Sequence, residues 1–101
     1  MPKESQILRA ITDYLTLKRY LFIRNGTGSF KTEKGGYFKT GSAGSPDILV
    51  FTEGGVCIGL EVKTSTGKLN ENQVAWKARA EKIGMRYCVV RSLDEAITAL
   101  Q

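Results

Sequence analysis

The segment from Pro46 to Lys63 constrains the fold more than any other part of the chain. It contains an apolar run at 48–51, a Glu-Gly-Gly turn at 53–55 and a second strand-like stretch at 58–63. An unbroken apolar run is typical of a strand covered on both faces, and proline is tolerated only at the first position of such a strand. The segment therefore predicts two core strands that pair as a hairpin around the turn.

Two carboxylates and one ammonium group meet if this hairpin forms. In an antiparallel pair the start of the first strand lies beside the end of the second, which brings Asp47 close to Glu61 and Lys63. Residues two apart on a strand project to the same face, so Glu61 and Lys63 lie together. Such a group can hold a hard divalent cation beside a phosphate. The alternative for Glu61 and Lys63 alone is a surface pair of little energetic weight.

The bulk composition is that of an ordinary globular protein. The chain has 101 residues, of which 42% are hydrophobic and 25% charged, so we expect a single domain over residues 1–101. No stretch approaches the roughly 18 apolar residues of a membrane span, and the N-terminus lacks a signal-peptide pattern. We therefore expect a cytoplasmic protein with no membrane partner.

Histidine is absent, and there are two cysteines. The absence of histidine excludes His-based triads and His-metal nucleases within the chain itself. Cys57 and Cys88 lie in apolar strand patterns without CxxC spacing, so we expect buried free thiols rather than zinc ligands. Any catalysis must come from carboxylates, lysine or a hydroxyl group.

Positive charge is concentrated immediately before Asp47. Of the net charge of +5, the whole excess lies between Leu17 and Pro46, which contains one acid, Glu33, and six basic residues. A basic surface beside carboxylates suits a polyanion delivered to a metal, although a solvated basic loop is the alternative. The six basic residues are Lys18, Arg19, Arg24, Lys31, Lys34 and Lys39.

Residues 26–45 form a long segment rich in glycine, serine and threonine. Glycines let backbone N–H groups approach phosphates closely, and Tyr37 has a ring that can stack on a base or sugar. A loop of this length in a small domain is more often functional than idle. We therefore expect part of this segment to contact DNA.

The remaining elements follow from helical spacing, strand-forming runs and capping residues. In chain order we expect a helix over residues 2 to about 20, a strand over 21–25, a possible strand over about 36–40, the two core strands, a helix capped by Asn70 that continues to Ile83, a strand over 86–90 and a short helix capped by Ser92. Without the possible strand this order is αβββαβα. It predicts an α/β fold with a central mixed sheet flanked by helices.

Two polar residues interrupt apolar helix faces. Glu4 lies four residues before Leu8 and is expected to point toward the core, although a first-turn glutamate favoured by the helix dipole is the alternative. Gln73 shares a face with Trp76, Ala80 and Ile83. The alternative to a site role for Gln73 is a purely structural one, in a capping box with Asn70. Both residues are candidate outer members of the acidic site.

These residues together resemble the PD-(D/E)xK nuclease superfamily. More narrowly, the chain is similar to a stand-alone VRR-Nuc domain (virus-type replication-repair nuclease) of the kind found in phages and prophages. A lone ExK motif carries little weight, but five blocks in the family's order are fairly specific. The blocks are Arg24–Gly28, Gly44–Asp47, Glu61–Lys63, Gly67–Leu69 followed by Gln73, and Val89–Ser92.

The resemblance implies a restriction-endonuclease-like core and a set of site residues. Asp47, Glu61 and the Val62 carbonyl would ligate Mg²⁺ or Mn²⁺, and Lys63 would orient the attacking water. Glu4 and Gln73 would correspond to the family's first-helix acid and its polar residue on the helix after the ExK strand. Together with the basic segment, the resemblance predicts DNA contacts by Arg24, Asn25, Lys31, Lys34, Tyr37, Lys39, Ser45 and Lys68.

The implied function is that of a Mg-dependent endodeoxyribonuclease in a bacterial or phage-infected cell. The family implies a homodimer that acts on four-way (Holliday) junctions or related branched DNA. Two other functions stay open. One is a non-catalytic basic module that binds nucleic acid, and the other is a sequence-specific restriction-type endonuclease, for which the sequence offers no identifiable base-reading element.

Overall fold

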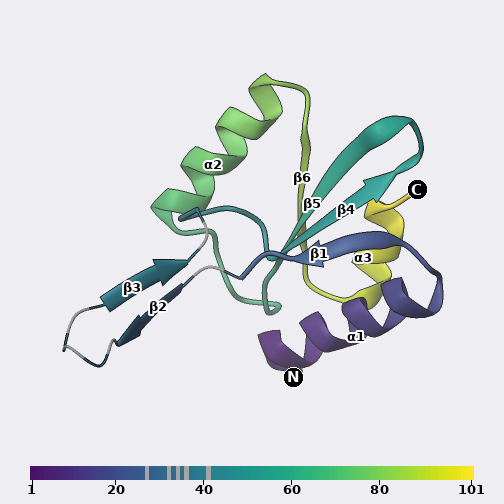
Figure 1. Cartoon of the computed structure of the whole chain (residues 1–101). Coiled ribbons are helices and arrows are strands. Elements are labelled where there is room, and N and C mark those ends of the chain that lie inside the picture. Colours follow the sequence, from purple (N-terminus) through teal and green to yellow (C-terminus); the bar gives the residue numbers. More distant parts are fainter. Residues whose placement is uncertain (27, 32, 34, 36, 41) are drawn as a thin grey trace.

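A four-stranded mixed sheet with helices on both faces forms the body of the protein (Figure 1). The computed structural model describes residues 1–26, 28–31, 33, 35, 37–40 and 42–101. The elements are α1 (Glu4–Leu17), β1 (Leu21–Arg24), β2 (Gly28–Lys31), β3 (Tyr37–Thr40), β4 (Ile48–Thr52), the 3₁₀ turn η1 (Glu53–Gly55), β5 (Val56–Val62), α2 (Glu71–Lys82), β6 (Arg86–Val90) and α3 (Leu93–Ala99). The strand order is β1-β4-β5-β6, and the predicted α/β fold is confirmed.

The predicted hairpin is the centre of this sheet. β4 and β5 pair antiparallel, with Ile48 opposite Leu60. Gly54 and Gly55 in the turn have φ angles of 79° and 73°, which glycine adopts without steric cost. β6 then pairs parallel to β5, and the connection between them runs through α2. The two central strands therefore place the acidic residues as the sequence predicts.

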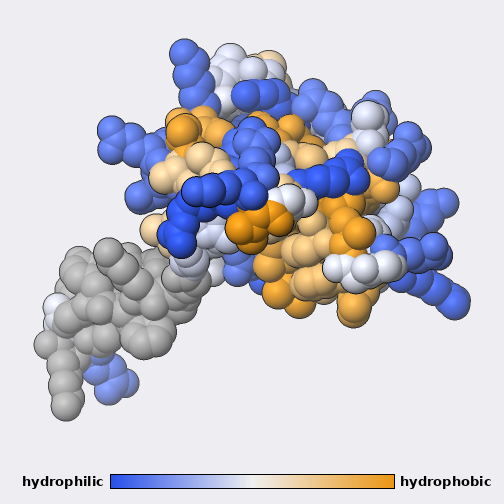
Figure 2. Space-filling view, turned by 90° about the horizontal axis from the view of Figure 1, so that it is seen from above, coloured by the Kyte–Doolittle hydropathy of each residue, from blue (hydrophilic) through white to orange (hydrophobic). Residues whose placement is uncertain are grey.

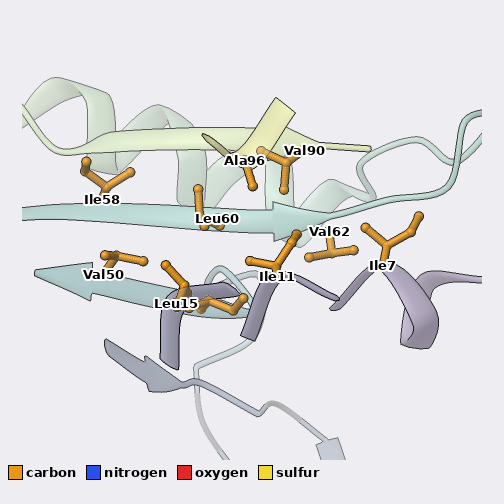
Figure 3. Close-up of a cluster of buried hydrophobic side chains, with 10 residues drawn as sticks. Ile7, Ile11, Leu15, Val50, Ile58, Leu60, Val62, Val90 and Ala96 are labelled. Carbon is orange, nitrogen blue, oxygen red and sulfur yellow. The ribbon is translucent and has the colours of Figure 1, made fainter. Parts of the chain in front are cut away.

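One face of the sheet holds the hydrophobic core (Figure 3). Alternate residues of β5 face α1 and α3, which lie on the same side of the sheet (Figure 1). This alternation turns the residues between them, Gly59 and Glu61, toward the opposite side, where α2 lies. The core residues are Ile7, Ile11, Leu15, Ile48, Val50, Ile58, Leu60, Val62, Val90 and Ala96.

Helix α1 is shorter than predicted at both ends. It begins after Lys3, whose backbone N–H donates to the Gln6 side chain at 2.8 Å, and the chain leaves it through Arg19, which has a φ of 61°. The prediction that Glu4 points toward the core is wrong, because Glu4 is exposed and the first buried residue is Ile7. Helical spacing continues one turn beyond the edge of the core.

Among the described residues, no helix is both long and apolar enough to cross a bilayer.

β2 and β3 form a separate two-stranded sheet that projects away from the body (Figure 1). β3 corresponds to the possible strand at 36–40, whereas β2 was not predicted. Its residues, Gly28–Lys31, have no apolar alternation, and the strand is defined by its pairing with Tyr37–Thr40. The projecting hairpin lies in the basic segment that precedes Asp47.

The second face of the sheet is only partly covered. Leu21 and Ile23 on the edge strand β1 are 71% and 51% exposed, and they lie opposite Phe51 and Leu49 of β4. Leu49 and Phe51 are half-buried. The prediction that the 48–51 run is covered on both faces of the sheet therefore holds for the core face only. We call these four residues the open apolar strip. Figure 2 shows hydrophobic surface exposed among hydrophilic side chains.

The side chain of Pro46 packs over Gly59 in the middle of β5. Pro46 is fully buried, and a Cβ added at Gly59 would lie 2.6 Å from Pro46 Cγ and 3.1 Å from Met85 Cε. A side chain at Gly59 would therefore displace Pro46 and, with it, the adjacent Asp47. Glycine at this strand position is required by a close approach, not by its backbone angles.

We expect Gly59→Ala to destabilise the protein by roughly 1 to 3 kcal/mol, because the added methyl group overpacks a closed contact. The free energy of unfolding, measured by urea denaturation, checks this. Gly26→Ala is the matched control, since a Cβ there would meet no described atom within 4 Å. Equal stability of the two variants would contradict the packing role of Gly59.

Candidate active site

Asp47 and Glu61 meet where β4 begins and β5 ends. Asp47 Oδ2 accepts the backbone N–H of Val62, the residue after Glu61, at 2.7 Å, and the Asp47 side chain is close enough to Glu61 to raise its pKa. Glu61 is buried, with 2% of its surface exposed, and Asp47 is half-buried. The predicted convergence of the two carboxylates is therefore confirmed.

Both oxygens of Glu61 accept hydrogen bonds from side chains. The Tyr87 hydroxyl donates to Oε1 at 3.1 Å, and the Gln73 amide donates to Oε2 at 3.2 Å. A carboxylate is costly to bury unless such partners are present. Sequence reasoning missed Tyr87, which lies in an apolar strand run. The available signal was its hydroxyl, because a buried tyrosine usually finds a hydrogen-bond partner.

Gln73 has both of the roles that the sequence left open. Its backbone N–H donates to Asn70 Oδ1 and its side-chain oxygen accepts the Asn70 N–H, each at 2.9 Å, which completes a capping box at the start of α2. Because the cap uses the amide oxygen, the amide NH₂ group is directed to Glu61. The cap and the acidic site are therefore built by the same side chain.

The surroundings of Glu61 favour its protonated form. Burial, followed by the hydrogen bond and the charge of Asp47, raises the pKa of Glu61 from 4.5 to about 8, while the Tyr87 hydrogen bond and the Lys63 charge lower it. Burial, together with the charge of Glu61, also raises the pKa of the Tyr87 hydroxyl, which keeps it a donor. Glu61 therefore carries a proton near neutral pH, and a cation can take the place of that proton.

The segment before Asp47 is fixed by polar contacts. The Asn25 amide donates to Ser45 Oγ at 2.8 Å and to the Pro46 carbonyl at 3.0 Å, and the Ser45 hydroxyl donates to the Ser42 carbonyl at 2.6 Å. Ser45 is 7% exposed. These internal hydrogen bonds give Ser45 a structural role, and its contact with DNA stays a prediction. Asn25 shares that role.

Gly44 lets this segment lie directly against the first turn of α2. It has a φ of 89°, and a Cβ there would be 2.1 Å from the Asn72 carbonyl oxygen. The Tyr87 hydroxyl lies 3.2 Å from the Gly44 carbonyl oxygen. Tyr87 thus contacts both the segment that leads to Asp47 and the carboxylate of Glu61.

Lys63 lies one residue beyond β5. Its backbone N–H donates to the Val90 carbonyl at 3.0 Å, and its charge acts on Glu61. Arg91 holds the following turn, donating from Nη1 to the carbonyls of Thr64 at 2.6 Å and Gly67 at 2.7 Å. The sequence placed Arg91 in a family block without giving it a role, and the structure makes it the residue that closes this turn.

The other predicted residues lie around this centre. Arg24 and Lys68 are exposed, and Glu4 is exposed in the first turn of α1. Lys31, Tyr37 and Lys39 belong to the projecting hairpin of β2 and β3. Lys34 lies outside the described residues. The structure therefore brings Asp47, Glu61, Val62, Lys63 and Gln73 together, and the roles of the remaining residues stay predictions.

The donor set suits a hard divalent ion. Within the described part of the chain, no group of three or more His, Cys, Asp or Glu residues is placed to hold a metal. Mg²⁺ keeps several waters and needs only one or two carboxylates plus phosphate oxygens, so the neighbouring carboxyl groups of Asp47 and Glu61 fit it. The Val62 carbonyl stays a predicted third ligand.

Comparisons with known proteins find a family model and a solved structure that match most of the chain. A family model described as the VRR-NUC domain matches residues 3–94. A solved structure described as a VRR_NUC domain is similar to the chain with a TM-score of 0.69 at 23% sequence identity, covering 99% of this chain and 96% of the other. No protein with a curated description matches the sequence.

The raised pKa of Glu61 predicts how stability depends on pH. The folded protein keeps a proton that the unfolded chain loses near pH 4.5, so this stabilisation is complete below pH 4.5 and is lost as pH rises through about 8. The loss should be on the order of a few kcal/mol. Urea denaturation from pH 4.5 to 8 checks it. Glu61→Gln should remove this slope, whereas Glu53→Gln on the exposed turn should keep it, and parallel curves for all three proteins would contradict the assignment.

Proposed function

Because the chain belongs to the VRR-NUC domain family, whose members are nucleases of the PD-(D/E)xK type, we propose that it is a divalent-metal-dependent endonuclease that cuts branched DNA as a homodimer. The observation that carries the proposal is the buried Glu61 carboxyl group beside the half-buried Asp47, with the charge of Lys63 acting on it. Two neighbouring carboxylates repel each other when both are ionised, and a bound divalent cation would remove that repulsion.

In the proposed site each residue has a distinct task. Asp47 and Glu61 hold Mg²⁺ or Mn²⁺ together with the Val62 carbonyl. When bound, the ion supplies an activated water and neutralises charge on the phosphate. The Lys63 ammonium group orients the attacking water and offsets charge that develops at the phosphate.

Three neighbours hold this arrangement in place. Gln73 and Tyr87 fix the two oxygens of Glu61, and the Val62 N–H fixes Asp47. These contacts come from α2, β6 and the sheet itself, so the carboxylates are oriented before DNA binds. Such preorganisation is the main way in which a protein site stabilises a transition state.

The charge distribution supports DNA as the substrate. The basic segment between Leu17 and Pro46 leads directly into Asp47, and part of it forms the projecting hairpin. Basic side chains neutralise phosphates and supply affinity that does not depend on sequence. A protein that binds in this way distinguishes DNA mainly by shape, which suits a branched substrate such as a four-way junction.

The open apolar strip supports the proposed dimer. One chain offers one acidic site, whereas paired cuts in a two-fold symmetric junction need two sites related by symmetry. Leu21 and Ile23 lie on the edge strand β1, and their side chains are largely exposed. Exposed apolar surface at a sheet edge favours association with a second copy. The open apolar strip is therefore the proposed contact between the two subunits.

Cleavage of a labelled four-way junction in Mg²⁺ tests the activity. Asp47→Ala and Glu61→Gln should each lower the rate by at least about 100-fold, because each removes a proposed ligand, while junction binding persists. Glu53→Gln, on the distant turn, should cut normally. Normal cutting by Asp47→Ala would overturn the assignment. Salt-sensitive binding without metal-dependent product would favour a binding module, and cutting of linear duplex at one fixed sequence would favour a restriction-type enzyme.

The solution mass tests the dimer. Sedimentation equilibrium should give twice the 11.1 kDa of one chain, and Ile23→Glu should shift the protein toward the monomer by placing a charge on the open apolar strip. Leu17→Glu is the matched control, since Leu17 is 78% exposed but lies on α1. A monomeric wild-type protein that still makes paired cuts would contradict the proposed contact.

A further inference from the structure

A cavity of about 310 Å³ lies beside the candidate active site. It opens between α2 and Ser42, the residue three positions before Ser45 on the way to Asp47. Its lining is mostly apolar, with one indole and one guanidinium group. The lining residues are Ser42, Trp76, Arg79, Ala80, Ile83 and Met85.

We propose that this cavity receives an unstacked nucleobase of the DNA strand whose phosphate is held at Asp47 and Glu61. The inference rests on the proposed nuclease function and deepens it, because it specifies what the enzyme reads in its substrate. A flat base that has left its stack is available at a branch point or in a single strand, but not inside an intact duplex.

The indole of Trp76 is held ready for stacking. Its Nε1–H donates to Ser42 Oγ at 3.2 Å, and its ring lies 5.8 Å from the Tyr87 ring at an angle of 44°. Tyr87 is buried and anchored in turn by Glu61. A base that stacks on an indole already fixed in place costs little further side-chain entropy, and such stacking tolerates any of the four bases.

The rest of the lining suits a planar apolar group with a polar edge. Ala80 is buried and Met85 is half-buried, and both add apolar surface to the lining. Ile83 was predicted to share a face of α2 with Trp76 and Ala80; all three line this cavity, where Ile83 is 82% exposed. Arg79 adds donors that can meet a base edge or the neighbouring phosphate. A cavity of this size is at the lower end of those that bind small molecules.

The cavity lies close to the acidic site along α2. Gln73 contacts Glu61, and Trp76 follows it three residues later on α2, a rise of about 4.5 Å. The base would therefore belong to a nucleotide close to the phosphate at Asp47 and Glu61.

Charge and position favour a base over a side chain of a second copy. Ser42 belongs to the same tightly held segment as Pro46, so the cavity and the acidic site share a wall. That segment follows the projecting basic hairpin, which draws a polyanion to this side of the molecule. A DNA strand that crosses the acidic site passes the cavity.

Trp76 is the single tryptophan of the chain, so its fluorescence reports on the cavity directly. In EDTA, where a metal-dependent enzyme does not cut, a four-way junction should quench the emission of the full chain at saturation. A linear duplex of equal length should quench it much less. An abasic nucleotide at the branch point should remove the quenching and weaken binding roughly 5- to 160-fold, the equivalent of one base–aromatic stack.

Two variants separate stacking from folding. Ile83→Glu keeps Trp76 and changes an exposed residue, so the protein should stay folded while junction binding weakens and quenching disappears. Val74→Glu is the matched control, because Val74 is 54% exposed on the same helix outside the lining. It should leave both measurements unchanged.

The outcomes distinguish the cavity from the catalytic proposal. Equal quenching by intact and abasic junctions would overturn the base-binding role. So would Trp76 emission that changes with protein concentration without DNA and does not respond to DNA, because the occupant of the cavity would then be a second copy. Metal-dependent cutting without quenching would overturn this inference alone. Quenching without any cutting would overturn the nuclease assignment and leave the base-binding cavity in place.

Discussion

Burial of the Glu61 carboxylate is the constraint on which the rest of the site depends. A carboxylate with 2% of its surface exposed is tolerated only where several groups stabilise it. Gln73 at the start of α2 and Tyr87 on β6 donate hydrogen bonds to it, and Asp47 before β4 is bonded to the neighbouring Val62 N–H. Each of these elements is therefore tied to one point. The sheet, the crossover helix and the loop before β4 cannot move independently without leaving Glu61 unpaired.

The two faces of the sheet divide the work between stability and chemistry. Alternate residues of β5 pack against α1 and α3 on one face, and Glu61 projects from the other. On the second face, glycines let neighbouring segments pack closely against the sheet and α2. Gly59 leaves space for Pro46, and Gly44 allows the loop to lie against the Asn72 carbonyl. These close approaches set the position of Asp47. The geometry of the acidic site therefore depends on two glycines that have no functional group of their own.

Much of the fold and the centre of the site could be predicted locally. The hairpin at 46–63 followed from an apolar run and a glycine turn, and strand β6 was predicted at its observed bounds. The misses have a common cause. Glu4 fits helical periodicity but lies beyond the part of α1 that the core covers. Strand β2 is defined by its partner, and Ser45 is buried by contacts that its own neighbourhood in sequence does not reveal.

The sequence by itself determined which groups have the chemistry: two carboxylates, a lysine and a basic segment, on strands whose pairing follows from their apolar pattern. Only the tertiary structure decided how those groups are held. In the folded chain Tyr87 contacts Glu61, Arg91 contacts the turn after Lys63, and Trp76 lines a cavity beside them. The physical reason is that strand pairing and helix capping are local, whereas burial, the raised pKa of Glu61 and the shape of a cavity depend on residues far apart in the chain.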